Sequence, residues 1–475
     1  MKSGNLFLLY NATVVTGEAA ENGSVAVNGE KISNIWYPEE DGTVSFNGKN
    51  IPHGILADEF RKLYPEAVIY DLSGKLLMAG GVDTHVHFRE PGLTEKADMA
   101  SESLAAMTGG VTSFIDMPNT TPPTISAERL AQKIDMASGR SYANFGFHIG
   151  ATNNNFNEIS ELLETREGSA SFGGIKVFMG SSTGNMLVDN ESSLEKIFRN
   201  RDKEVLVHCE DESIIRENTA TAKNRFGEDI PFCEHENIRS RKACIKSSAK
   251  ALEMAIKYGT RLHLLHISTA EEVEMVRAAK SINSDITAET SVNYLWFSNE
   301  DYDRMGSRLK CNPSVKGRKD RDALRNALRE GIIDSIGSDH APHLPAEKDR
   351  KYLTAPSGLP SVQQSLSVLL TVADQEDIPL TRVASAFSER VSEMFGIESR
   401  GKIKEGFYAD LVIVDPDRKF IVNKDNLKYK CGWSPYEGEE LKGYVESVFI
   451  SGREVVKDGN PDTHAAFGKR LIFNR

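Results

Sequence analysis

Residues 80–92 read GGVDTHVHFREPG, a stretch that contains His85 and His87 and is preceded by the apolar residues 76–78. In a β-strand, side chains at positions i and i+2 point to the same face, so the two imidazoles are expected side by side. Neutral imidazole is the commonest metal ligand among protein side chains. The pair therefore indicates either a metal site or two histidines satisfied by hydrogen bonds, and the rest of the chain must decide between them.

The composition is that of a globular enzyme, with 475 residues, of which 39% are hydrophobic and 27% charged. This length exceeds the usual size of one domain and predicts a large domain with a smaller one. The net charge of −12 argues against a nucleic-acid-binding surface, which would be basic. The five cysteines are scattered, and the apolar run 6–10 is too short for a signal peptide or a membrane span. We therefore expect a cytoplasmic protein without a disulfide framework.

Short apolar runs alternate with amphipathic stretches between about residues 79 and 395. The runs are 76–88, 111–118, 144–151, 175–180, 204–211, 262–269, 285–292 and 333–342. Strands that alternate with helices predict parallel βα units, and eight of them predict a TIM-type (β/α)8 barrel. Long connections around 212–246 and 293–332 predict insertions into this barrel.

Both ends of the chain consist of short strand-like pieces separated by Gly and Asn. They form either two unrelated appendages or one shared β-sandwich beside the barrel. Because the termini of a domain usually lie close together, we expect the shared sandwich. The predicted division is 1–78 and 396–475 for the sandwich, and 79–395 for the barrel.

Residues able to bind a metal fall at or near the ends of the predicted strands, where barrel enzymes build their active sites. They are His85, His87, Lys176, His208, His266 and Asp339. Asp339 can bind a metal and act as a general base, or alternatively cap a helix. Since an ammonium repels metal cations, Lys176 either contacts an anionic substrate or is modified to an anion. His263 is opposite in strand parity to His266, and we expect it to face outward against a helix.

This ordered set of ligands on an eight-stranded barrel resembles the amidohydrolase superfamily, in its cyclic amidohydrolase branch. The resemblance covers essentially the whole chain. It implies two divalent metal ions, usually zinc, bridged by a carboxylated Lys176. One metal is bound by His85, His87 and Asp339, and the other by His208 and His266. It further implies a hydroxide between the metals as nucleophile, with Asp339 as general acid and base.

Within this branch the sequence is most similar to the dihydroorotase family. The tract HVHFREPG carries Arg89, IDMPNTTPP (115–123) carries Asn119, and the Asp-His-Ala-Pro-His segment ends at His343. The resemblance implies that these three residues hold a substrate carboxylate, and a guanidinium is well suited to pair with one. The alternative for Arg89 is a surface ion pair with Glu90 or Glu95.

Two further residues are implied as substrate contacts. Asn312, in LKCNPSVKGRKDRDAL (309–324), matches a residue that contacts the substrate ring. Thr183 matches a threonine of a mobile loop that closes over the substrate, although GSSTG is equally typical of a surface turn. The sequence departs from many relatives at Asn293, where they carry a histidine.

The implied reaction is the reversible, zinc-dependent hydrolysis of (S)-dihydroorotate to N-carbamoyl-L-aspartate, a step of pyrimidine (UMP) biosynthesis. It involves a small-molecule substrate, without nucleic acid or membrane, and the sequence leaves the oligomeric state open, a homo-oligomer included. Two rival functions remain. One is a hydantoinase-, dihydropyrimidinase- or allantoinase-like cyclic amidohydrolase, and the other is a non-catalytic homologue.

Overall fold

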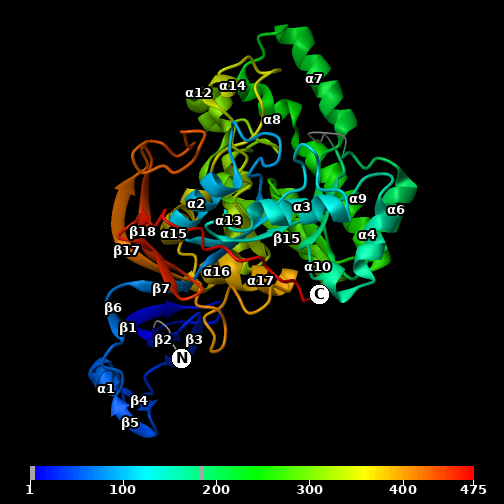
Figure 1. Cartoon of the computed structure of the whole chain (residues 1–475). Coiled ribbons are helices and arrows are strands. Elements are labelled where there is room, and N and C mark those ends of the chain that lie inside the picture. Colours follow the sequence, from blue (N-terminus) through cyan, green and yellow to red (C-terminus); the bar gives the residue numbers. More distant parts are fainter. Residues whose placement is uncertain (1–5, 181–185, 475) are drawn as a thin grey trace.

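The computed structural model describes residues 6–180 and 186–474 and contains the predicted barrel (Figure 1). Its parallel strands follow one another in chain order: β8 (Gly81–Val86), β9 (Val111–Asp116), β10 (Asn144–Phe147) with β11 (Ile149–Gly150), β12 (Gly174–Phe178), β13 (Glu204–His208), β14 (Leu262–Leu264), β15 (Thr287–Ser291) and β16 (Ser335–Gly337). The third strand is interrupted at His148. The barrel closes between β16 and β8, where His87 N donates to His340 O at 2.8 Å. The predicted fold is therefore confirmed.

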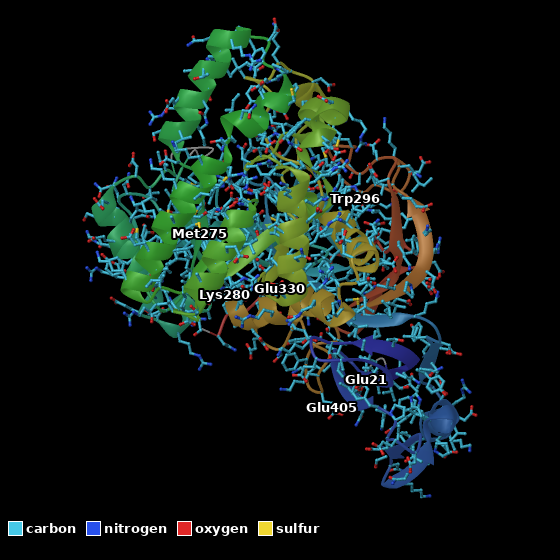
Figure 2. The ribbon with its side chains drawn as sticks, turned by 180° about the vertical axis from the view of Figure 1, so that it is seen from behind. Glu21, Met275, Lys280, Trp296, Glu330 and Glu405 are labelled. Atoms are coloured by element: carbon cyan, nitrogen blue, oxygen red, sulfur yellow. The ribbon has the colours of Figure 1, made fainter. Side chains whose placement is uncertain are left out.

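Apart from the first, which lies beside the N-terminal strands, the helices cover the outside of the barrel and extend above it. They are α1 (Leu56–Leu63), α2 (Met99–Thr108), α3 (Ala127–Ala137), α4 (Phe156–Leu163), α5 (Arg166–Ser169), α6 (Glu191–Phe198), α7 (Glu212–Phe226), α8 (His235–Ile238), α9 (Arg241–Tyr258), α10 (Ala270–Lys280), α11 (Val292–Trp296), α12 (Tyr302–Met305), α13 (Arg318–Glu330), α14 (Pro345–Lys348), α15 (Ser365–Gln375), α16 (Leu380–Ala384) and α17 (Arg390–Phe395). Helix α10 begins with a capping box between Thr269 and Glu272, which satisfies amide groups at its start. Figure 2 shows α10 and α13 side by side, with Lys280 and Glu330 at their ends.

The predicted insertions lie in part at one end of the barrel, since α13 of the second insertion packs beside α10 instead. Figure 1 shows α7, α8, α12 and α14 grouped at the top, on the side away from the N-terminal sheet. Helix α7 is capped by Asp211, whose side chain accepts from Ile214 N. Because Asp211 follows β13 directly, this group of helices stands over the carboxyl ends of the strands.

The two chain ends share one sheet, as the sequence predicted. The sheet combines β1 (Leu6–Val15), β2 (Ala20–Asn28), β3 (Lys31–Trp36), β6 (Val68–Asp71) and β7 (Leu76–Ala79) with β17 (Leu411–Ile421), β18 (Glu440–Ile450), β19 (Arg453–Lys457) and β20 (Asn460–Pro461). Strand β7 joins the halves, because it pairs parallel with β1 and antiparallel with β17. A separate hairpin, β4 (Thr43–Phe46) and β5 (Lys49–Pro52), packs with α1 against this sheet.

The run 76–88 was interpreted as one barrel strand, and this was wrong. It comprises β7 of the terminal sheet and β8 of the barrel, with Gly80 and Gly81 between and at the start of the two. A Cβ at Gly80 would collide with Thr112, and one at Gly81 with the ring of Phe387. Only glycine, which has no Cβ, fits at these two positions. The apolar pattern of the run does not reveal this, because the colliding side chains come from other parts of the chain.

Residues 396–475 also depart from the expected division, because parts of this segment pack on the barrel. At its end, Leu471 N donates to Phe145 O at 2.8 Å. Leu471 and Phe473 join a buried cluster that includes Val82 and Ile115 from β8 and β9. The loop between β17 and β18 contacts the site end instead, since Trp433 Nε1 donates to His343 O. The C-terminal segment therefore touches both ends of the barrel.

All five cysteines lie within the described residues and carry free thiols. Among the helices of the described chain, none combines the length and apolar character needed to cross a membrane.

Replacing Phe473 with Ala should destabilise the protein, since Phe473 is 1% exposed in the hydrophobic cluster that it forms with residues of β8 and β9. We expect the free energy of unfolding, measured by urea denaturation, to fall by about 3–5 kcal/mol. Ile472→Ala is the matched control because Ile472 is 38% exposed, and it should change stability by no more than about 0.5 kcal/mol. Equal losses of stability in both variants would show that burial of Phe473 against the barrel does not stabilise the fold.

Candidate active site

A pocket of about 280 Å³ opens at the carboxyl ends of the barrel strands. Every site residue predicted from the sequence lines it except Thr183, which lies outside the described residues. The lining consists of His85, His87, Arg89, Asn119, Lys176, Phe178, His208, Arg239, His266, Asn312, Asp339, Ala341, His343, Pro356, Ser357 and Gly358. The structure thus brings the predicted metal ligands and the predicted substrate contacts together around one cavity.

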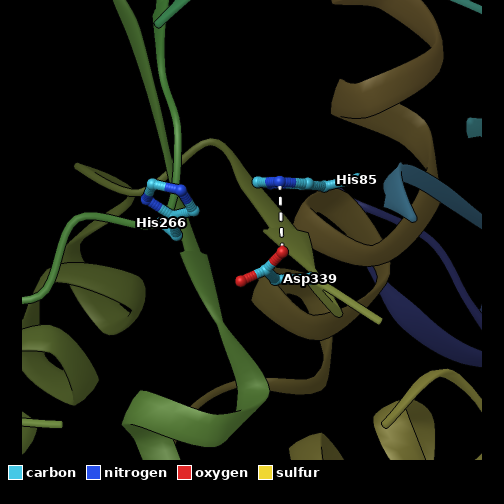
Figure 3. Close-up of side chains that lie close together, drawn as sticks. All are labelled: His85, His266 and Asp339. Carbon is cyan, nitrogen blue, oxygen red and sulfur yellow. Dashed lines mark ion pairs between the residues drawn. The ribbon is translucent and has the colours of Figure 1, made fainter. Parts of the chain in front are cut away.

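Asp339 faces the histidine pair from across the barrel seam. Its Oδ1 lies 3.3 Å from Nε2 of both His85 and His87. Figure 3 shows the contact with His85 as a dashed line, with the ring of His266 beside it. Asp339 and His266 both have positive φ, at 46° and 36°. This conformation is unfavourable for residues other than Gly, and strain of this kind is concentrated at functional sites.

Hydrogen-bond acceptors behind the histidines orient their rings. His85 Nδ1 lies 2.7 Å from Glu289 Oε1, and His87 Nδ1 lies 2.8 Å from Asn119 Oδ1. Because both oxygens only accept, each Nδ1 carries a hydrogen and each Nε2 presents a lone pair to the pocket. Asn119 therefore has a second role that the sequence did not predict, in addition to lining the cavity.

The lone pairs of His85 and His87 create a need for positive charge. Burial lowers the pKa of His85 well below its usual value, so this ring is neutral. Its Nε2 lone pair and Asp339 Oδ1 are then two acceptors facing each other at 3.3 Å. A divalent cation between them would satisfy both, as in sites where a carboxylate or carbonyl orients a metal-binding histidine. The residues present fit a metal at this position.

His208 and His266 are the remaining histidines of the predicted ligand set. His208 Nδ1 lies 3.0 Å from His266 Nε2, and His208 Nε2 lies 3.1 Å from Glu210 Oε2. Single ligand atoms of His85, His266 and Asp339 lie within 4.8 Å of one another. Imidazole and carboxylate groups this close together are typical of binding sites for zinc and related metals.

Lys176 lies in the middle of β12 and points into the same cavity. It is 1% exposed, and burial lowers its pKa to about 7. Its ammonium lies 4.6 Å from the centre of the Phe178 ring. A buried lysine with this tendency to lose its proton is chemically suited to modification, since only the neutral amine is a nucleophile.

His263 was expected to face outward against a helix, and this was wrong. Its backbone is in register with Leu206 of β13, which is in register with Lys176, so all three side chains point into the barrel. His263 Nδ1 lies 2.8 Å from Thr287 Oγ1, and its ring contacts Phe395 below the site. The parity argument failed because β14 ends at Leu264 and the positive φ of His266 breaks the alternation.

Arg89 is a buried cation that forms no ion pair with any of the described residues. Its Nε donates to Pro342 O at 3.1 Å, and its Nη2 lies 3.1 Å from His343 Nε2. The surface ion pair considered from the sequence is absent among the described residues, where Glu90 pairs with Arg140 instead. Arg89 is 7% exposed, and burial lowers its pKa. A buried guanidinium with no carboxylate paired to it among the described residues favours an anionic ligand in the adjacent cavity.

Asn312 and Asn293 differ in what they contact. Asn312 lines the pocket, and its buried Oδ1 has no hydrogen-bond partner among the described residues. Asn293 is used internally, because its Nδ2 donates to Ser338 O and its Oδ1 accepts from Tyr436. Asn293 therefore anchors the loop after β16.

Comparison with known proteins identifies the family. The amidohydrolase family model matches residues 76–455. A dihydroorotase of Methanosarcina acetivorans is 35% identical over 81% of this chain and 82% of its own length. The chain belongs to the amidohydrolase family. An allantoinase of Desulfitobacterium hafniense is 32% identical over 82% of this chain and 87% of its own length.

The family fold extends over the full length. L-hydantoinase (dihydropyrimidinase) from Arthrobacter aurescens superimposes with a TM-score of 0.87 at 24% identity, covering 98% of this chain and 99% of that chain. This likeness concerns the fold alone. As a member of the family, the chain is a hydrolase of the class that acts on cyclic amides, for which bound divalent metals are usual.

Three residues of this amidohydrolase site were missed in the sequence. Glu289 and Glu210 are fully buried carboxylates behind His85 and His208, and Arg239 lines the pocket and pairs with Glu210. A signal for both carboxylates was present. Glu210 follows His208 by two residues, and Glu289 interrupts a buried strand, where an unpaired charge is not tolerated.

Replacing Glu289 with Met should weaken metal binding, because His85 loses the acceptor that orients it. We expect the affinity for zinc, measured by competition with a chelating dye, to fall about 10- to 100-fold. Glu204→Met is the matched control, since Glu204 is also buried in a barrel strand but pairs with Arg261. If both variants bind zinc equally well, Glu289 does not orient the ligand.

Proposed function

We propose that the protein is a dihydroorotase, which interconverts (S)-dihydroorotate and N-carbamoyl-L-aspartate. The observation that carries this proposal is Arg89, a buried guanidinium beside the ligand set with no carboxylate paired to it among the described residues. Dihydroorotate bears a carboxylate on its ring, whereas hydantoin, dihydrouracil and allantoin do not. Only the first would supply the charge that this part of the pocket lacks.

The polar groups of the pocket also suit the ring of this substrate. Asn312 Oδ1 is a buried acceptor without a partner in the described chain, and a ring N–H of a cyclic amide is a donor. Arg89 and Asn312 thus offer a donor for the carboxylate and an acceptor for the ring. Their shared position in one cavity supports a carboxylate-bearing cyclic amide.

Two divalent metals, which we propose to be zinc, would be held by His85, His87 and Asp339 and by His208 and His266. Metals at such ligands lower the pKa of water and polarise a carbonyl group. We further propose that Lys176 is carboxylated. The ammonium would first lose a proton, and the neutral amine would then add to carbon dioxide with loss of a second proton. A carbamate anion would thus replace the cation and offer two oxygens to the metals.

Asp339 is the proposed general acid and base. Its carboxylate lines the same cavity as the proposed substrate contacts, so it can accept a proton from the attacking water. Delivery of that proton to the ring nitrogen completes C–N cleavage and releases the open-chain product. In the reverse direction Asp339 removes the proton from the carbamoyl nitrogen, as cyclisation requires.

Replacing Arg89 with Met should abolish recognition of the carboxylate. We expect kcat/KM for dihydroorotate to fall by about a hundredfold or more, because one partner of a buried charge pair is lost. Arg140→Met is the control, since Arg140 pairs with Glu90 outside the pocket. A substrate panel of dihydroorotate, hydantoin, dihydrouracil and allantoin decides the reaction. Turnover of allantoin without turnover of dihydroorotate would reject the proposal in favour of an allantoinase.

Removal of metal should abolish activity reversibly. We expect chelator-treated protein to lose turnover of dihydroorotate and to regain it when zinc is added, since the proposed metals would polarise the carbonyl group and lower the pKa of the attacking water. Metal content and activity are measured on the same samples. Full activity in protein shown by elemental analysis to be metal-free would contradict this part of the proposal.

A further inference from the structure

Lys96 approaches the proposed carboxylate-binding residues from behind. Its Nζ lies 3.3 Å from His343 Nδ1 and 2.8 Å from Glu347 Oε1. Its side chain is 13% exposed. On the pocket side of the same ring, His343 Nε2 lies 3.1 Å from Ser357 O and 3.1 Å from Arg89 Nη2. Lys96 itself does not line the pocket.

These contacts determine which nitrogen of His343 carries the hydrogen. An ammonium can only donate, so Nδ1 accepts from Lys96 and the ring hydrogen is on Nε2. Ser357 O accepts that hydrogen at 3.1 Å. Burial, together with the charges of Arg89 and Lys96, lowers the pKa of His343. The ring is therefore neutral and carries a single hydrogen, on either Nδ1 or Nε2.

This tautomer leaves Arg89 available for a ligand. Arg89 Nη2 and His343 Nε2 are then two donors 3.1 Å apart, and neither can satisfy the other. Both groups can donate to an anion in the adjacent cavity. In the opposite tautomer, Nε2 would accept from Arg89, and the pair would satisfy itself without a ligand.

The surroundings would favour that opposite tautomer if Lys96 were absent. Glu347 Oε2 lies 3.7 Å from His343 Nδ1 and would attract a hydrogen on that nitrogen. Glu347 is held in place, because the same oxygen accepts from Leu344 N at 3.0 Å. The position of Lys96, between Glu347 and the ring, is what opposes this outcome.

We propose that Lys96 is a positioning residue that keeps His343 and Arg89 as donors and thereby sets the specificity of the pocket for a carboxylate-bearing ring. This inference rests on the proposed function. It assigns Lys96 no contact with the substrate. Its effect on binding is exerted through the tautomer of His343.

The test compares Lys96→Met with wild-type holoenzyme. We expect KM for dihydroorotate to rise about tenfold, the size expected when a hydrogen bond to a charged group is lost, while kcat changes by less than about twofold. Lys96→Arg should restore KM because a guanidinium also only donates. Lys430→Met is the control, since Lys430 pairs with Asp98 outside the pocket.

A double-mutant cycle separates this role from a general structural one. If Lys96 acts through His343, the Lys96→Met change should have no further effect on KM in a His343→Ala background. Additive effects would overturn the proposal. Nitrogen NMR of protein labelled in its histidine rings gives a second readout, with the His343 signal identified by its loss in His343→Ala. We expect the hydrogen on Nε2 in the wild type and on Nδ1 in Lys96→Met.

The two proposals fail in different ways. A wild-type enzyme without activity on dihydroorotate would reject the proposed function, and the NMR measurement would still decide whether Lys96 controls His343. An active wild type whose KM and His343 tautomer are both unchanged by Lys96→Met would reject the role of Lys96 alone.

Discussion

Strands β8 and β16 meet where the barrel closes, and hydrogen bonds across this seam position the reactive end of the molecule. His87 N donates to His340 O, and Asp83 accepts from Ser338 N and from His85 N. Burial raises the pKa of Asp83 to about 7, which means that its charged form is destabilised and depends on these hydrogen bonds. The seam brings the ends of the first and last strands together. Without it, Asp339 would not face the histidine pair.

Around this seam the pocket has two electrostatic halves. On one side, Glu289 and Glu210 accept from or contact the histidines, so the lone pairs and Asp339 present negative potential that suits metal cations. On the other side, Arg89 is a cation without a carboxylate partner among the described residues. A substrate that is an anion at one end and a polarisable amide at the other matches both halves. Because the two halves have opposite charge, they would also fix the orientation in which such a substrate binds.

Much of the fold and the site could be predicted because the patterns are local. Alternating apolar runs and amphipathic helices predict a barrel, and ligands at strand ends predict their convergence, since parallel strands all end at one face. The prediction failed where neighbours in space intervene. Gly80 lies between two strands and Gly81 begins the second of them, at positions where Thr112 and Phe387 leave no room for a Cβ. His263 points inward because a positive φ at His266 breaks the alternation on which parity depends.

The sequence by itself predicted the barrel, the sheet shared by both chain ends, the candidate metal-binding residues in their order, and the presence of an arginine near the histidine pair. Tertiary structure alone decided how these groups act. Which nitrogen of His85 or His87 is presented to the pocket depends on Glu289 and Asn119, which reach the rings from other strands. Whether Arg89 forms an ion pair with its neighbour Glu90 depends on the direction of the Glu90 side chain, which pairs with Arg140. Hydrogen bonds and ion pairs act over a few ångströms, so their partners are set by folding and not by distance along the chain.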